Sequence, residues 1–99
     1  MSMERILSKN YEDLTVADWA ILDIELDKEL GDAKLSSKRR RKLRSSTFCG
    51  PNRSFPVPDC AHVTAARRLI GRYHGSESTK ARIMSCVNRK AKQLGCGGS

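Results

Sequence analysis

Three stretches of the chain place apolar side chains at three- and four-residue intervals, and this spacing restricts them to helices. Side chains three or four positions apart share one face of an α-helix, whereas a half-buried strand needs strict alternation. The three apolar faces consist of Trp19, Leu22, Leu26 and Leu30; of Val63, Ala66, Ile70 and Tyr73; and of Ile83, Met84, Val87, Ala91 and Leu94.

Residues that begin and end helices flank each of these stretches. Thr15 and Asp18 form a variant of the capping box, and Asp59 and Ser78 are suitable N-caps for the other two helices. Glycines that suit helix C-termini follow the three stretches, at Gly31, Gly75 and Gly95. Few residues separate the second helix from the third, so we expect an antiparallel hairpin. The alternation in residues 23–27 also suits a strand, but the length of the stretch favours a helix.

We therefore predict a small all-α fold: an acidic N-terminal helix plus a C-terminal antiparallel helical hairpin braced by a Pro-rich loop. The chain of 99 residues divides into an acidic amphipathic helical head (1–32), a basic linker (33–47), a loop plus helical hairpin (48–96) and a linker remnant (97–99). A single domain of this size leaves little room for a deep substrate pocket. It contains no glycine-rich phosphate loop, His-Glu-x-x-His or nucleophile elbow. We expect a protein that is not an enzyme.

Charge is divided unequally between the two ends of the chain. Residues 1–32 hold three Lys and Arg against nine acids, a net charge of −6, and residues 33–99 hold sixteen against two, a net charge of +14. So positive a segment attracts nucleic acid, acidic protein surfaces or anionic lipid. Two alternatives remain open: the charge serves solubility, or the acidic head folds back onto the basic body.

The basic residues most suited to an anionic partner lie in the linker and on the following helix. Neutralising phosphates releases counterions, so such cations bind DNA or RNA without reading its sequence. Neither a DNA-reading motif nor an aromatic stacking platform accompanies them. A flexible basic linker that contacts an acidic protein surface is nearly as good an interpretation. The candidate residues are Lys38, Arg39, Arg40, Arg41, Lys42, Arg44, Arg53, Arg67 and Arg68, with Arg72 extending the patch.

An unusual motif connects the linker to the hairpin. Pro51, Pro56 and Pro58 predict an extended loop over residues 48–59, because proline has no amide proton and disfavours helix before it. The order of residues in this loop is Phe48, Pro51, Arg53, Phe55-Pro56, Asp59 and His62, the last opening an Ala-rich helix. This order resembles a small domain of unknown function common in tailed-phage and prophage proteins.

The resemblance spans roughly residues 35–96 and implies a phage or prophage origin, often near head and structural proteins. It implies no known chemistry. The chain departs from the family pattern at Leu43-Arg44, where the family often has Leu-Pro, and it carries a fuller set of cysteines. Whether a metal or a disulfide is general to the family therefore stays open.

Four cysteines and one histidine are the candidate metal ligands: Cys49, Cys60, His62, Cys86 and Cys96. Thiolates and imidazole suit the tetrahedral coordination of one structural zinc ion. A hairpin brings Cys60 and His62 beside Cys96, while Cys86 sits ten residues from Cys96 along the same helix, so that His62 can replace it. The absence of a Cys-x-x-Cys pair weakens the prediction. Disulfides, or free thiols with His62 bonded to the loop backbone, are the alternatives.

The remaining candidate site is the first apolar face, formed by Trp19, Leu22, Leu26 and Leu30, which docks either on a partner or on the body of the protein itself. The leading functional hypothesis is a non-catalytic phage structural or interaction protein that is virion- or head-associated. Its basic helical body would dock on phage structural proteins, an acidic surface or DNA. The alternative is a small basic nucleic-acid-binding regulatory protein of a phage. Without a membrane span or signal peptide, we expect it in the host cytoplasm, the virion or both.

Overall fold

The computed structural model describes residues 3–96, and the predicted linker remnant at 97–99 lies outside this range. The protein is mostly helical, with a small two-stranded sheet that makes the all-α prediction roughly rather than fully correct. The helices are α1 (Met3–Leu7), α2 (Val16–Leu30), α3 (Ser37–Lys42), α4 (Cys60–Arg72) and α5 (Glu77–Leu94), and 3-10 turns cover Tyr11–Asp13, Gly31–Ala33 and Ser45–Thr47. Every helix within residues 3–96 is too short or too polar to cross a lipid bilayer.

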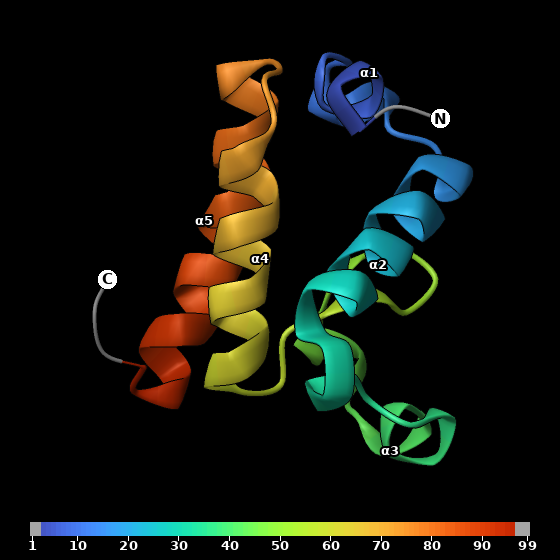
Figure 1. Ribbon diagram of the computed structural model, residues 1–99, viewed down its shortest axis with the longest axis vertical. Helices are drawn as coiled ribbons and strands as arrows, with labels where there is room; N and C mark the ends of the chain where they lie inside the picture. The colour runs from blue at the N-terminus through green and yellow to red at the C-terminus, as the bar shows by residue number, and fades with distance from the viewer. Residues whose placement is uncertain (1–2, 97–99) are drawn as a thin grey trace.

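Helix α4 lies at the centre of the fold, with α2 on one side and α5 on the other (Figure 1). The α4–α5 pair is the predicted antiparallel hairpin. The apolar faces of the three long helices meet in one core, in which Leu22, Leu69 and Val87 are almost fully buried. Head and body therefore share a single core.

Most of the predicted caps are present, but α4 has its C-cap at Tyr73, two residues before the predicted Gly75. Thr15 and Asp18 form a reciprocal capping box at α2, and the Asp59 side chain accepts a hydrogen bond from the His62 amide at the start of α4. Helix α5 begins two residues before the predicted position, because Ser76 rather than Ser78 accepts a hydrogen bond from the Thr79 amide. Its C-cap is Gly95, whose φ of 72° suits a residue without a Cβ atom.

The Pro-rich segment is a small hairpin rather than only an extended loop. Strands β1 (Phe48–Gly50) and β2 (Ser54–Pro56) pair antiparallel, with Phe48 opposite Pro56 and Gly50 opposite Ser54. The turn places Asn52 and Arg53 at φ values of 54° and 56°. Sequence patterns for strands rarely detect three-residue strands that contain proline.

Helix α1 is another element that the sequence does not predict. Its Met3, Ile6 and Leu7 side chains are buried against the core. The Ser76 amide donates to the Leu7 carbonyl oxygen at 2.8 Å, which ties α1 to the turn between α4 and α5. Figure 1 shows α1 beside this turn. One further prediction was wrong: the Leu94 side chain is 42% exposed and does not face inward.

Candidate functional site

The predicted basic linker contains a short helix held at one end of the molecule (Figure 1). Helix α3 begins after Ser36, whose hydroxyl accepts a hydrogen bond from the Arg39 amide at 3.2 Å. Within α3, Arg40 forms an ion pair with Asp23 of α2, and its guanidinium donates to the Arg53 carbonyl oxygen at 2.8 Å. The five-cation run is thus anchored to the rest of the protein through one of its members.

Arg53 fastens the β1–β2 turn to α3. Its Nη2 atom donates to the carbonyl oxygens of Arg40 and Leu43, both at 2.8 Å, and lies within 3.4 Å of that of Arg41. Its guanidinium also stacks over the Phe48 ring, 4.6 Å from the centroid. Two predicted binding cations, Arg40 and Arg53, therefore have structural partners within the chain.

The other cations of this region point outward. Lys38, Arg39, Arg41, Lys42 and Arg44 are exposed, and none of them forms an ion pair with an acid in residues 3–96. At about 100° per residue, Lys38 and Lys42 lie opposite the inward-facing Arg40, with Arg39 and Arg41 between them. We call these five residues the α3 cation cluster. Four of them form a half-circle of positive charge around α3, and Arg44 follows the helix.

The charge of the cluster also reaches the start of α4. Burial by itself would raise the pKa of the Asp59 carboxyl group, but two hydrogen bonds from His62, the His62 charge and the charge of Arg39 together lower it. Asp59 is consequently anionic at neutral pH. Asp59, the N-cap of α4, is thus an acidic group whose pKa the α3 cation cluster helps to lower, through Arg39.

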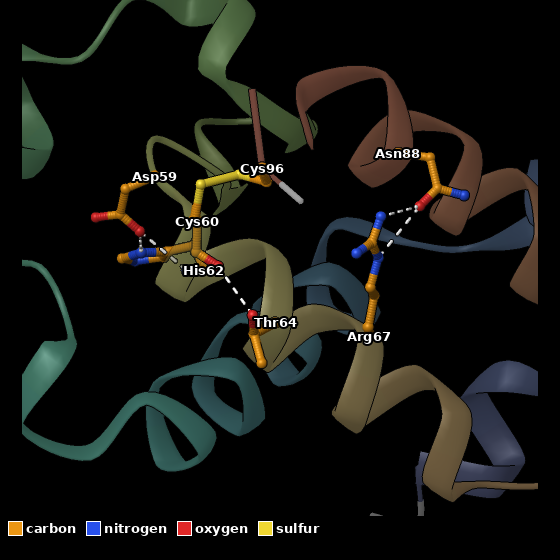
Figure 2. The surroundings of a disulfide bond; sticks show 7 residues. All are labelled: Asp59, Cys60, His62, Thr64, Arg67, Asn88 and Cys96. Carbon is orange, nitrogen blue, oxygen red and sulfur yellow. Dashed lines mark hydrogen bonds and ion pairs between the residues drawn. A yellow bond between two sulfur atoms is a disulfide. The ribbon is translucent and has the colours of Figure 1, made fainter. Parts of the chain in front are cut away.

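The arginines that were predicted to extend the basic patch along α4 lie beside polar or acidic residues of other helices. The Arg67 guanidinium donates to Asn88 Oδ1 on α5, with distances of 3.0 and 3.3 Å (Figure 2). Arg72 pairs with Glu29 of α2, and Arg68 lines a shallow hollow that Glu29 also borders. These three arginines lie among polar or acidic neighbours and do not continue the α3 cation cluster.

The acidic head folds back onto the basic body, which was one of the two alternatives for the charge asymmetry. Ion pairs between the two parts join Asp23 to Arg40, Glu29 to Arg72 and Glu12 to Arg82. Three of the nine acids of residues 1–32 are therefore paired with cations of the basic body.

The prediction of a structural zinc ion is wrong, because all four cysteine sulfurs are engaged in disulfides. Cys49 pairs with Cys86 and Cys60 pairs with Cys96, with Cα–Cα distances of 6.0 and 5.6 Å. A zinc ligand must be a thiolate, and a sulfur in a disulfide bond is not. No group of three or more Cys, His, Asp or Glu side chains in residues 3–96 is placed to hold a metal ion.

His62, the fifth predicted ligand, has a structural role in this fold. Its Nδ1 atom lies 2.7 Å from Asp59 Oδ1, and the same oxygen accepts a hydrogen bond from the His62 amide at 2.9 Å (Figure 2). The ring is fully buried, and its Nε2 atom has no hydrogen-bond partner within residues 3–96. The His62 ring thus pairs with the Asp59 side chain at the first turn of α4, and not with the loop backbone as the alternative to zinc had it.

The predicted partner-docking face is part of the core. Trp19 is 4% exposed, Leu22 and Leu26 are fully buried, and Leu30 is 9% exposed. The Trp19 ring contacts the rings of Tyr11 and Phe55 edge-on, with centroid distances of 6.1 and 6.0 Å. These side chains dock on the body of the protein itself and are not accessible to a partner.

Sequence reasoning missed the role of Asp23, which it treated as a solvated residue of α2. One oxygen of Asp23 pairs with Arg40, and the other accepts a hydrogen bond from the Phe55 amide at 3.3 Å. Asp23 therefore positions both α3 and the strand hairpin. The one sequence feature that could have indicated this role is that Asp23 lies off the apolar face of α2 in a chain that also carries a run of cations.

Comparison of the chain with family models, curated proteins and solved structures finds no match.

Proposed function

We propose that this protein is a non-catalytic binding protein whose α3 cation cluster contacts the phosphate backbone of nucleic acid without reading its sequence. One observation carries the proposal: five exposed cations lie on or just after a helix that Arg40 and Arg53 fix to the fold, and none of the five forms an ion pair in residues 3–96. The ion pairs between the head and the body engage Arg40, Arg72 and Arg82, and they leave these five cations uncompensated.

The character of α3 favours phosphates over a protein surface. Protein interfaces usually contain an apolar, well-packed centre with charges at the rim. Helix α3 has no apolar residue, and its sequence is Ser-Lys-Arg-Arg-Arg-Lys. Phe48, the nearest large ring, is buried beneath Arg40 and Arg53. A surface that offers charge alone suits a partner whose surface is regularly charged, as a nucleic-acid backbone is.

The proposed setting is a phage or prophage, where the protein would be a structural or interaction protein associated with the virion or head and in contact with packaged nucleic acid. The motif from Phe48 to His62 and its resemblance to tailed-phage domains support this setting. A regulatory nucleic-acid-binding protein would use the same cluster. Detection of the protein in purified particles would favour the structural role over the regulatory one.

The decisive experiment measures binding of the purified, oxidised protein to a short duplex and to a single strand across a salt series. Each neutralised phosphate of duplex DNA contributes about 0.9 to the slope of log K against log salt. The variant Lys38→Gln/Lys42→Gln should weaken binding at every duplex sequence and reduce that slope by about two.

A matched control removes the same charge elsewhere. Arg89 and Lys90 lie on α5 and, like the α3 cations, form no ion pair in residues 3–96. The variant Arg89→Gln/Lys90→Gln should leave the slope unchanged. If the control and α3 variants weaken binding equally, only net charge matters and the α3 site is refuted. If the wild-type protein does not bind at low salt, the proposed function itself is refuted.

A further inference from the structure

Two surfaces remain that neither the core nor the α3 cation cluster uses, and the first is the outer face of α2. Val16 and Ile24 are 54% and 56% exposed, and together with Leu94 they are the large hydrophobic side chains left exposed in residues 3–96. Val16, Ala20 and Ile24 follow one another at four-residue intervals, so they form a continuous apolar strip. We call these three residues the α2 strip.

Two acids of α2, Glu25 and Asp27, remain available near this strip, because Asp18 is buried beside Lys9, and Asp23 and Glu29 pair with Arg40 and Arg72. Helix α2 contains five acids, Asp18, Asp23, Glu25, Asp27 and Glu29, against the single cation Lys28. Asp27 lies one turn or less from Ile24 and lines a shallow hollow beside it. The outer side of α2 therefore has an apolar centre with the carboxylates of Glu25 and Asp27 near it, on a helix of net negative charge, unlike the all-cationic surface of α3.

The second surface is a groove between α4 and α5 with a volume of about 630 Å³, lined by Arg67, Met84, Asn88, Ala91, Lys92 and Cys96. Met84, Ala91 and the Cys96 disulfide supply its apolar part, and Arg67 and Lys92 are its cations. Arg67 and Asn88 meet across the groove, and Cys96 lies near them (Figure 2). Helix α5 carries five cations, Lys80, Arg82, Arg89, Lys90 and Lys92, against the one acid Glu77. The groove is therefore apolar in its centre and basic in its surroundings.

We propose that the α2 strip of one molecule docks in the α4–α5 groove of a second copy of the same chain. The two surfaces are complementary in character, an acidic helix with an apolar strip and a basic groove with an apolar floor. Within one molecule they cannot meet, because α4 separates α2 from α5 (Figure 1). The contact is therefore between copies, and it uses different patches on the two partners.

A contact of this head-to-tail type leaves one free strip and one free groove at the ends of each dimer. Further copies can add until the rotation between neighbours closes a ring, and otherwise a filament grows. Each added copy contributes another α3 cation cluster. The inference is independent of the proposed nucleic-acid contact, because neither surface includes a residue of that cluster.

Sedimentation velocity of the oxidised, full-length protein at increasing concentration tests the proposal. The wild-type mass should rise with concentration, whereas Ile24→Asp and Asn88→Trp should each raise the dissociation constant about tenfold or more. The first variant places a charge in the strip, and the second fills the groove from an exposed position. Matched controls are Leu94→Asp, which gives the same change at an exposed apolar residue outside both surfaces, and Gln93→Trp, which lies on α5 outside the groove. Both controls should associate like wild type.

Mixing the two disrupting variants gives the sharper result. Ile24→Asp keeps an intact groove and Asn88→Trp keeps an intact strip, so an equimolar mixture should form dimers that grow no further. A wild-type protein that stays monomeric overturns the proposal, as does association that neither variant weakens, or variants that fail to complement. Binding of an acidic peptide to the groove of a monomeric protein would assign that groove to a different partner. Circular dichroism verifies folding, and Val16→Asp, in the first turn of α2 where an acid suits the helix dipole, replaces Ile24→Asp if needed.

Discussion

At the scale of single residues, Arg53 has an unusual backbone conformation in the strand hairpin, as do its neighbours Asn52 and Phe55. It occupies the left-handed region at a φ of 56°, which is uncommon for a large side chain. Its guanidinium donates hydrogen bonds to carbonyl oxygens at the C-terminal end of α3 and stacks on Phe48. The planar guanidinium of arginine can donate hydrogen bonds to several acceptors at once while it stacks on a ring. The compact ammonium of lysine cannot reproduce this geometry.

We therefore expect both Arg53→Ala and Arg53→Lys to lower the free energy of unfolding by about 1 kcal/mol. The measurement is urea denaturation followed by circular dichroism. Arg41→Ala is the control, because this neighbouring side chain is exposed and without an ion pair in residues 3–96, and its effect should stay within about 0.5 kcal/mol. If Arg53→Lys has the same free energy of unfolding as wild type, the positive charge at position 53 stabilises the fold and the guanidinium geometry does not.

Asp18 supports a pH-dependent prediction. Burial alone would raise the pKa of its carboxyl group, but hydrogen bonds from Lys9 at 2.7 Å and from the Thr15 amide at 3.0 Å lower it below the ordinary value. A folded-state pKa below the unfolded value, about 3.9, means that the stabilisation is complete above that pH. It is lost as the pH falls through the folded-state pKa.

Asp18→Asn should accordingly lower the free energy of unfolding by about 1–2 kcal/mol at neutral pH. The difference from wild type should shrink as the pH is lowered to about 2. Urea denaturation at a series of pH values measures both. Asp32→Asn serves as control, since Asp32 is exposed and has no ion pair in the described chain. If the difference in the free energy of unfolding between Asp18→Asn and wild type stays constant down to low pH, the negative charge of Asp18 does not stabilise the fold.

At the scale of secondary-structure elements, the sequence predicts those features whose causes are local. Thr15 with Asp18, and Asp59 with His62, act within one helical turn, so residue type and spacing suffice to place α2 and α4. Helix α1 and the strand hairpin have only five and three residues per element. Segments this short are not stable alone, and contacts with distant parts of the chain select their structure.

For the candidate sites, too, the sequence predicts features with local causes and misses those that depend on distant contacts. Exposure of most of the α3 run could be predicted from its charge, because a row of cations cannot be buried. The engagement of Arg40 with Asp23, seventeen residues away, could not. Likewise, four cysteines permit three pairings, and spacing alone does not choose among them or exclude zinc. The choice depends on how the strand hairpin packs against α5.

The contact between α1 and the α4–α5 turn is tested at Gly75. A Cβ atom on Gly75 would lie 2.7 Å from both the Cβ and the carbonyl oxygen of Leu7. Gly75→Ala should therefore displace α1 and lower the free energy of unfolding by about 1–3 kcal/mol. Amide hydrogen exchange should show faster exchange in α1, in addition to a lower midpoint in thermal unfolding.

Gly71 provides the matched control for this substitution. It lies within α4, and a Cβ atom there would meet nothing within 4 Å. Gly71→Ala should therefore raise the free energy of unfolding by about 0.5–1 kcal/mol, since alanine favours helix. If the two variants behave alike, the close approach of Leu7 does not hold α1.

At the scale of the whole molecule, two disulfides connect the strand hairpin and the start of α4 to α5. Their sequence separations are 37 and 36 residues, so loop-closure entropy gives each a similar stabilisation of about 4 kcal/mol. Cys49→Ala/Cys86→Ala and Cys60→Ala/Cys96→Ala should each lower the free energy of unfolding by about that amount in urea denaturation. Alkylation with mass spectrometry should find no free thiol in the oxidised wild type. Stoichiometric alkylation of the folded protein would contradict both pairings.

The distribution of charge over the whole molecule leads to a prediction in which stability and binding change in opposite directions. Within α3, Lys38 repels Arg41 and Lys42, and Arg39 repels Lys42, because residues three or four apart are neighbours on a helix. Each such like-charge pair destabilises the helix by about 0.2–0.5 kcal/mol. The net charge of +8 adds a repulsion that the head-to-body ion pairs only partly offset.

The variant Lys38→Gln/Lys42→Gln should therefore raise the free energy of unfolding by about 0.5–1 kcal/mol at low salt, while it weakens binding to duplex DNA. Salt should reduce the gain in stability, because it screens the repulsion. Urea denaturation and binding at matched salt concentrations measure the two effects on the same samples. A loss of both stability and binding would show that these lysines hold the fold together. A gain in stability together with a loss of binding identifies these lysines as charges that destabilise the fold and that the nucleic-acid partner requires.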